Sequence, residues 1–310
     1  MIPSLNNKKT EILVTGGAGY IGQSFLRCLE RNKIPAICLY RKRPPESLQR
    51  ISPFSVDLAQ DTPSIPCQGI ETVVHLAWER SLGLSDSRGP QMNGGNNLHS
   101  LRNLIAAMER EGVRRLIFLS IIGAKKDARY LYAREKYEAE HEILNSKIPE
   151  KIIVRSSLVY GGNEYEGDFL ASLRRLMRCP GIYPLPKIKG RLAPIFIEDL
   201  NSFLLRCLSF PIKKSSAIVN VLGTDSYKSD ELLRAISKSY QEGRIPLGSF
   251  IGDALIRFLE RKREEGSVPG VRFFLDLASG LEDQLGLKNP LYEILPKQTV
   301  SLQTVLQAKT

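Results

Sequence analysis

A tyrosine and a lysine four residues apart, Tyr132 and Lys136, lie in the stretch YLYAREKYEAE, whose pattern predicts a helix. At this spacing the two side chains share one helix face, so the ammonium can reach the phenol. A free phenol ionises at a pKa of about 10, and a neighbouring cation favours the phenolate. The pair could therefore exchange a proton with a carbonyl or alcohol oxygen near neutral pH. Alone, a YxxxK pattern is more often an exposed aromatic and a lysine on an amphipathic helix.

Glycines crowd the stretch TGGAGYIG at residues 15–22, directly after the apolar run EILV. Gly17, Gly19 and Gly22 satisfy GxGxxG, a pattern that needs a strand before it and a helix after it. Without Cβ atoms the chain can turn tightly, approach a pyrophosphate and pack the new helix on a sheet, while the helix N-terminus offers N–H groups to phosphates. The required context is present, so the stretch predicts dinucleotide binding. The alternative is a glycine-rich turn that binds nothing.

The residues after the second expected strand, Tyr40 to Arg43, include three cations and no carboxylate. About 20 residues past the glycines, NAD-binding sheets usually place Asp or Glu to hold the ribose hydroxyls, whereas an arginine there accommodates the 2′-phosphate of NADP. We therefore expect NADP(H) to be the favoured cofactor, with Arg41 as the main contact and NAD possible. The alternative is that RKRPP forms only a solvated basic loop.

The elements that must position these residues follow from the apolar pattern. Strands are expected over residues 11–15, 36–40, 72–77, 115–120 and 151–157, and helices over residues 20–32, 96–112 and 130–145. Strands that are apolar on both faces and alternate with helices imply a parallel sheet covered on both sides. The predicted fold class is therefore α/β, a doubly wound parallel sheet of the Rossmann type, with a smaller helix-rich C-terminal lobe.

The domain organisation follows from a change of pattern near residue 160, where loops rich in glycine and proline begin. Residues 1–160 should form the dinucleotide-binding Rossmann domain, and residues 161–310 a smaller substrate-binding lobe. One further strand candidate, AIVNVLG, indicates that the chain returns to the first domain at about residues 195–223.

Composition excludes several classes of protein. No apolar run approaches the roughly 18 residues that a membrane span needs, and the polar first ten residues do not resemble a secretory signal, so we expect a cytoplasmic protein without a membrane partner. Five scattered cysteines and three scattered histidines predict reduced thiols and no metal site. The net charge of +11 is divided among short basic groups beside acidic residues. This distribution argues against nucleic acid and leaves a small anionic substrate as the expected ligand.

Taken together, the motifs resemble the short-chain dehydrogenase/reductase superfamily, specifically its extended NAD-dependent epimerase/dehydratase branch. The resemblance continues through VVHLAW, NLHSLRNLIAAMEREGVRRLIFLS, KIIVRSSLVYGG and PIFIEDL, and covers about residues 11–223. It implies an NAD(P)-dependent oxidoreductase or epimerase whose substrate is a nucleotide-linked keto sugar. Members of the family often dimerise through two helices, here residues 92–111 and 130–146, so a homodimer is expected.

The resemblance also assigns roles to particular positions. It makes Tyr132 the acid/base, Lys136 the lysine that holds the nicotinamide ribose, and Asn97 the asparagine that supports a proton relay. Asn97 could also be a helix cap, and Asp57 a turn residue. The cofactor contacts that it implies are Gly16, Gly19, Tyr20, Ile21, Gly22, Asp57, Leu58, Leu76 and Ala77, together with Tyr132 and Lys136.

Two features depart from the family pattern. Where the family usually binds the substrate oxygen with Ser or Thr, this chain has an isoleucine, and the candidate catalytic serine, Ser120, falls one residue early. The segment between Ser120 and Tyr132 is also shorter than in sugar-nucleotide epimerases. Loss of one oxyanion donor can cost about 10² to 10³ in rate. The alternative to an enzyme is therefore a cofactor-holding structural or regulatory protein with little or no turnover.

Overall fold

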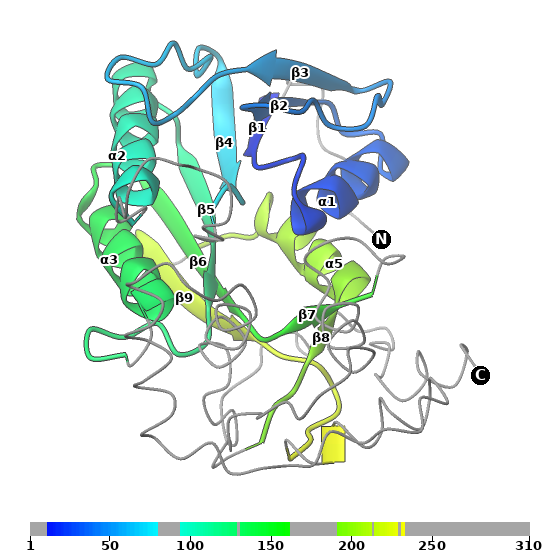
Figure 1. Ribbon diagram of the computed structural model, residues 1–310. Coiled ribbons are helices and arrows are strands. Elements are labelled where there is room, and N and C mark those ends of the chain that lie inside the picture. The colour runs from blue at the N-terminus through cyan, green and yellow to red at the C-terminus, as the bar shows by residue number, and fades with distance from the viewer. Residues whose placement is uncertain are drawn as a thin grey trace, which may run out of the picture.

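The computed structural model describes residues 11–79, 94–128, 131–161, 191–212, 214–228 and 231–232. Its main sheet has seven parallel strands in the order β3-β2-β1-β4-β5-β6-β9 (Figure 1). Because this order reverses between β1 and β4, the carboxyl ends of those two strands form the switch point at which doubly wound sheets bind ligands. The strands are β1 (Glu11–Thr15), β2 (Ala36–Tyr40), β3 (Ile51–Ser55), β4 (Ile70–His75), β5 (Arg115–Ile121), β6 (Glu150–Ser156) and β9 (Ser216–Val221).

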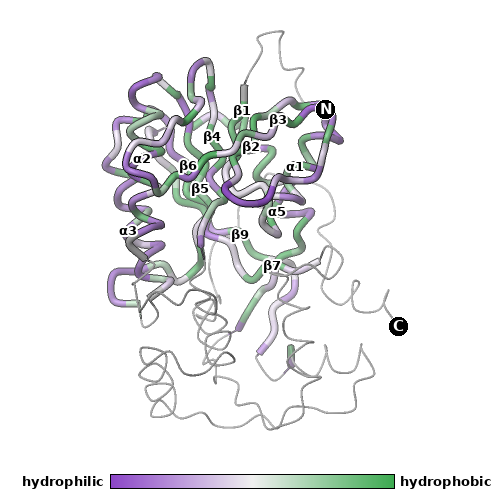
Figure 2. Tube along the Cα trace, turned by 45° about the horizontal axis from the view of Figure 1, so that its top comes forward, coloured by the Kyte–Doolittle hydropathy of each residue, from purple (hydrophilic) through white to green (hydrophobic). Residues whose placement is uncertain are grey.

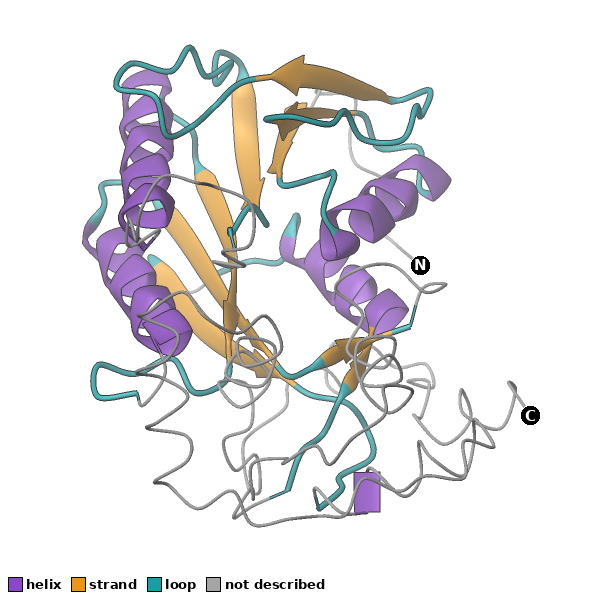
Figure 3. Ribbon diagram, viewed as in Figure 1, coloured by secondary structure: helices purple, strands orange, loops and turns teal. Residues whose placement is uncertain are grey.

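Helices cover both faces of this sheet. Figure 3 shows α2 (Gly94–Glu111) and α3 (Leu131–Asn145) on one side, with α1 (Tyr20–Arg31) and α5 (Ile197–Cys207) on the other. Along β1, Ile12 and Val14 pack with residues of α1 and α5, whereas Leu13 packs with residues of α2 and α3. Strands buried on both faces explain the continuous apolar runs in the sequence. The predicted doubly wound Rossmann sheet is therefore confirmed.

The distribution of hydropathy agrees with this layering. Figure 2 shows hydrophobic residues gathered along the strands and hydrophilic residues along much of α2 and α3. β5 is buried along nearly its whole length, as expected for a central strand covered by helices. Within the described residues, no helix is long and apolar enough to span a membrane.

One strand of the sheet, β3, was not predicted from the sequence. β3 has the sequence ISPFS, and only its first residue, Ile51, is buried. It lies at the edge of the sheet beside β2, where Pro53 is tolerated because an edge strand needs fewer ladder hydrogen bonds. Because only one residue of this edge strand is buried, its sequence contains no apolar run, and the hydrophobic pattern did not predict it.

The chain returns to this domain after residue 191. A short parallel pair, β7 (Val159–Tyr160) and β8 (Ile195–Phe196), precedes α5, and β9 then pairs with β6 at the far edge of the sheet. Residues 162–190 and 233–310 lie outside the described residues, so the proposed C-terminal lobe and its boundary stay predictions.

A buried arginine fixes the end of α5 to the sheet. The Arg115 guanidinium donates to the carbonyl oxygens of Cys207 and Leu208, at 2.6 and 2.8 Å, and to that of Phe210 at 3.0 Å. It also pairs with Glu150, with 2.5 Å between nitrogen and oxygen, and only 3% of its side chain is exposed. A cation at a helix C-terminus satisfies the last carbonyl groups and complements the helix dipole.

Replacing Arg115 with alanine should lower the free energy of unfolding by about 2–4 kcal/mol, because buried carbonyls and a carboxylate lose their donor. Arg110→Ala is the matched control: Arg110 is an exposed arginine paired with Glu111, and its loss should cost less than about 0.5 kcal/mol. Urea unfolding followed by circular dichroism measures both variants. Equal losses in the two would show that Arg115 does not stabilise the end of α5.

Candidate functional site

The turn after β1 brings two stretches of backbone closer together than any side chain would allow. Gly16 has φ +75°, and a Cβ at this position would lie 2.5 Å from the backbone nitrogen of Ala77. A Cβ at Gly22 would lie 2.1 Å from the carbonyl oxygen of Gly16. Glycine is therefore required at both positions. Gly16 needs it for its positive φ and for lack of space, and Gly22 needs it for lack of space. This is the cradle that a dinucleotide pyrophosphate needs.

The helix that follows the turn leaves its N-terminus available to an anion. α1 begins at Tyr20, its cap residue Gly19 makes no side-chain capping hydrogen bond, and its first turn contains no acidic residue. The first N–H groups of a helix lack partners within the helix, and their dipoles favour negative charge. Together with the glycine turn, this arrangement fits a bound pyrophosphate.

The two central strands are joined at their carboxyl ends by a small polar network. The Thr15 hydroxyl lies 2.7 Å from Nδ1 of His75 and accepts a hydrogen bond from the backbone N–H of Ala77 at 3.2 Å. The backbone N–H of Leu76 donates to the carbonyl oxygen of Thr15 at 3.2 Å. The predicted cofactor contacts Leu76 and Ala77 are thus fixed directly beside the glycine turn.

The predicted tyrosine and lysine lie together on α3. Lys136 is buried, and its ammonium donates to the carbonyl oxygen of Leu119 at 2.8 Å. The ammonium nitrogen is 5.9 Å from the ring centroid of Tyr132, 4.5 Å from that of Phe118 and 4.0 Å from that of Trp78. Trp78 directly follows Ala77 in the segment that leaves β4. Its contact with Lys136 therefore places the pair close to that segment.

Trp78 is a site residue that the sequence analysis did not single out. The motif VVHLAW has tryptophan where the family pattern VxHLAA has its second alanine, so the signal was present in the sequence. Its ring lies over the Lys136 ammonium, an arrangement that stabilises the cation through the aromatic face. A large ring at this position makes the surroundings of Lys136 more enclosed than alanine would.

Asn97 has a defined task in the structure. Its side-chain oxygen accepts from the backbone N–H of Glu79 at 2.9 Å, and its amide nitrogen donates to the carbonyl oxygen of Glu79 at 2.9 Å. Asn97 is the fourth residue of α2, which begins at Gly94, so it is not the cap of that helix. It clamps the end of the described segment that leaves β4. Its role in a proton relay stays a prediction.

Arg41 is already engaged in an ion pair. Its guanidinium donates to Oε1 of Glu79 at 3.0 Å, and both side chains are about 40% exposed. The hydrogen bond to Glu79, with a smaller contribution from the charge of Asp57, raises the pKa of Arg41 above its usual value. Glu79 was not considered in the sequence analysis, because no local pattern signals a pair between residues 38 positions apart.

Ser120 lies in a buried polar cluster under α3. Its hydroxyl donates to Oε1 of Glu140 at 2.5 Å, and Arg155 binds both oxygens of the same carboxylate. Ser120 is 1% exposed and Glu140 is equally buried. The hydroxyl therefore has a structural partner, and this placement gives no support to Ser120 as a substrate contact.

The remaining predicted cofactor contacts follow the carboxyl ends of β1 and β3 along the chain. The Asp57 carboxylate accepts from the backbone N–H of Ala59 at 3.0 Å, as a turn residue does. Leu58 is buried against α2 through the cluster that it shares with Leu101. The Tyr20 hydroxyl donates to the carbonyl oxygen of Gly161 just past β7, and Ile21 packs partly buried beside it.

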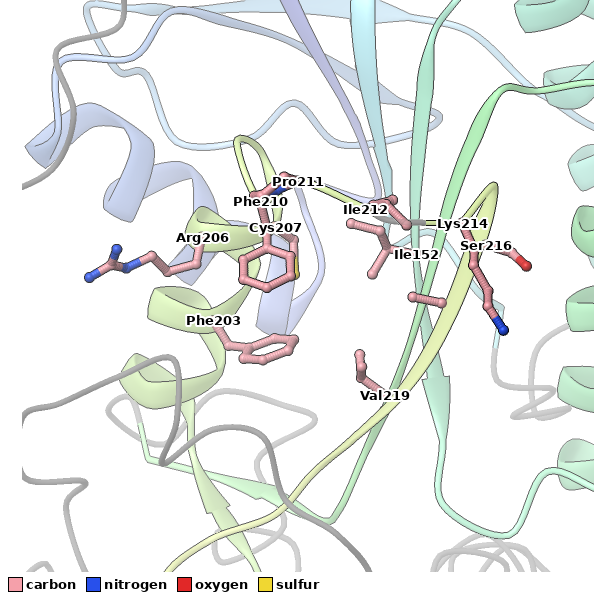
Figure 4. Close-up of a pocket in the computed structure, with 11 residues that line it drawn as sticks. Ile152, Phe203, Arg206, Cys207, Phe210, Pro211, Ile212, Lys214, Ser216 and Val219 are labelled. Carbon is pink, nitrogen blue, oxygen red and sulfur yellow. The ribbon is translucent and has the colours of Figure 1, made fainter.

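A cavity of about 470 Å³ lies away from this site, between α5 and strands β6 and β9. Figure 4 shows Phe203 and Phe210 on one side of it and Ile152 and Val219 on the other. Its lining residues Ile152 and Ser216 lie near the amino ends of β6 and β9, whereas ligands of doubly wound sheets bind at the carboxyl ends. Within the described residues, no group of three or more His, Cys, Asp or Glu side chains could hold a metal ion.

Comparison with known proteins places this geometry in context. The model of the NAD dependent epimerase/dehydratase family matches residues 12–221. UDP-glucose 4-epimerase 3 from Oryza sativa subsp. japonica is 32% identical over 126 residues. That alignment covers 35% of this chain and 34% of the relative, so the chain matches about a third of the length of this curated protein.

Two solved structures superpose well on this chain. A nucleoside-diphosphate-sugar epimerase from Staphylococcus aureus superposes with a TM-score of 0.70 at 17% identity, covering 96% of this chain and 100% of that one. A UDP-glucuronic acid 4-epimerase from Bacillus cereus, in complex with UDP-glucuronic acid and NAD, superposes with a TM-score of 0.66 at 17% identity, covering 97% and 98%. At these identities the likeness is one of fold.

The histidine of the polar network gives a testable pH dependence. Burial, and to a lesser extent the charge of Lys136, lowers the pKa of His75 to about 3. In the unfolded chain a histidine has a pKa of about 6.5, so below that pH the unfolded state binds a proton that the folded state does not. Between about pH 8 and 5, His75 should therefore lower the free energy of unfolding by about 2 kcal/mol.

The variant His75→Asn keeps an acceptor for Thr15 but does not titrate, so it should lose that part of the pH dependence. His141→Gln, a change at an exposed histidine of α3, serves as the control. Urea unfolding at several pH values measures the slope. If His75→Asn has the same slope as the wild type, His75 takes up its proton in the folded protein as it does in the unfolded chain, and the network is different.

Proposed function

Since the chain belongs to the NAD dependent epimerase/dehydratase family, we propose that it is an NAD(P)-dependent oxidoreductase or epimerase acting on a nucleotide-linked keto sugar. The observation that carries this proposal is the chain of contacts from the glycine turn to Tyr132. Gly16 adjoins Ala77, the next residue Trp78 covers Lys136, and Lys136 lies beside Tyr132. A cofactor on the glycine turn would thus extend toward a proton donor.

The chain offers distinct groups to the two ends of a dinucleotide. The turn at Gly16 and the N-terminus of α1 would hold the pyrophosphate, and Leu76 and Ala77 would border the nicotinamide half. At the adenosine end, Arg41 is the candidate contact for the 2′-phosphate of NADP(H). The nicotinamide, when bound, supplies or accepts hydride.

The chemical task of the protein side chains is proton transfer. The Tyr132 hydroxyl would give a proton to the carbonyl oxygen of the keto sugar, or take it back in the reverse direction. The buried ammonium of Lys136 stabilises negative charge on the phenolic oxygen and is itself held by Leu119. Trp78 shields this ammonium from water, which strengthens its electrostatic effect.

The substrate class is supported by the related proteins and by charge. The Bacillus cereus relative was solved with a nucleotide sugar and NAD. The chain itself carries a net charge of +11, which suits a ligand with a diphosphate. A homodimer formed through α2 and α3 and a cytoplasmic location remain part of the proposal.

A second candidate function is that of a cofactor-holding structural or regulatory protein. Two observations favour it: Ser120 is hydrogen-bonded to Glu140 rather than presented to a substrate, and Trp78 encloses Lys136. Such a protein would bind the dinucleotide without exchanging hydride.

The decisive experiment measures hydride transfer with a panel of 4-keto nucleotide sugars, using both NADH and NADPH. The enzyme proposal predicts turnover that Tyr132→Phe lowers by about 10² to 10⁴, because the proton donor is removed. Tyr137→Phe, on the same helix, is the matched control and should retain activity. Cofactor binding without turnover would favour the second candidate, and turnover that survives in Tyr132→Phe would exclude Tyr132 as the acid/base.

A further inference from the structure

The ion pair between Arg41 and Glu79 joins the segments that follow β2 and β4. Arg41 follows β2 and Glu79 follows β4, and these two strands flank β1 on either side. Their side chains meet at 3.0 Å, beyond the end of β1 from which the turn departs. The pair therefore lies at the edge of the sheet where the adenosine half of a dinucleotide would be bound.

Glu79 is held at this place by more than its charge. Asn97 binds both the N–H and the carbonyl group of its backbone, at 2.9 Å each. Asn97 is buried, so this clamp is shielded from solvent. An exposed ion pair alone contributes little, but a backbone fixed in this way keeps the carboxylate near Arg41 at small entropic cost.

The carboxylate and a 2′-phosphate would compete for the same guanidinium. Both accept from the N–H groups of Arg41, and the phosphate carries nearly two negative charges. A phosphate on Arg41 would also lie close to the charge of Glu79, with Asp57 as a further negative neighbour of the guanidinium. The ribose of NAD(H) carries hydroxyl groups instead of the 2′-phosphate, and these can donate hydrogen bonds. The Glu79 carboxylate can accept them, whereas residues 40–43 after β2 contain no carboxylate.

We propose that Glu79 sets the choice between the two dinucleotide cofactors: it engages Arg41, opposes the 2′-phosphate of NADP(H) and offers a hydrogen-bond acceptor to the ribose of NAD(H). This inference rests on the proposed function, because it requires a dinucleotide on the glycine turn. It assigns a specificity-determining role to a residue outside the glycine motif and outside β2.

Calorimetric titration of NADH and NADPH tests the assignment directly through dissociation constants. The proteins are the wild type, Glu79→Gln, Arg41→Ala and the double variant. Glu79→Gln keeps the backbone contacts to Asn97 and removes only the charge. It should increase the affinity for NADPH relative to NADH by about tenfold, because the competitor and the repulsion are both lost. In the Arg41→Ala background the same change should alter the ratio by less than about threefold.

Glu142→Gln is the matched control, since Glu142 forms an ion pair of similar exposure with Arg102 between α2 and α3. It changes the net charge equally and should leave the ratio as in the wild type. A ratio that Glu79→Gln does not move, or that Glu142→Gln moves as much, overturns this inference alone. A wild-type protein that binds neither NADH nor NADPH overturns both this inference and the proposed function.

Discussion

The contact between the turn after β1 and the segment after β4 is the constraint on which the site depends. The backbones approach so closely at Gly16 and Ala77 that no Cβ fits between them. Thr15 supports this approach with its hydroxyl, which binds both His75 and the Ala77 backbone. Because the strand order reverses between β1 and β4, the connections that leave these two strands run to opposite faces of the sheet, and doubly wound sheets bind their ligands at such a point.

The segment at residues 76–79 connects the two ends of the proposed cofactor site. Ala77 borders the glycine turn, Trp78 covers Lys136 toward α3, and Glu79 pairs with Arg41 at the end of β2. Consecutive residues thus contact α3 on one side and the residue that follows β2 on the other. A change in the position of this segment would therefore affect both ends of the proposed cofactor site together, and would link the proposed cofactor choice to the proposed proton donor.

The sequence was sufficient for the sheet apart from β3, for helices α1, α2 and α3, and for the glycine turn, because each of these has a local signature. Continuous apolar runs mark strands buried on both faces, and the i, i+4 spacing brought Tyr132 and Lys136 to one face of α3. The side of the sheet toward which the Ser120 side chain points could also have been derived. Leu116 and Phe118 of β5 pack with α2 and α3, and the alternation of side chains along a strand places Ser120 on that same side.

Other features could not be derived, because they depend on contacts between distant residues. The edge strand with Pro53 has no apolar run, and the pair of Arg41 with Glu79 forms only when β2 and β4 are placed around β1. The role of Asn97 as a backbone clamp likewise requires the position of α2 relative to the end of β4. Such contacts follow from topology rather than from spacing.

The central claim is that the glycine turn and the segment after β4 form one dinucleotide site, and energy transfer from Trp78 to NADH tests it most directly. The chain contains one tryptophan, so its emission reports on this segment alone. The account predicts saturable quenching of Trp78 by NADH, and at least about tenfold weaker binding in Gly16→Ala, where a Cβ would meet Ala77. Gly112→Ala is the control, since Gly112 also has a positive φ but open space around it. Absence of saturable quenching, or equal binding by Gly16→Ala and the control, would contradict the account.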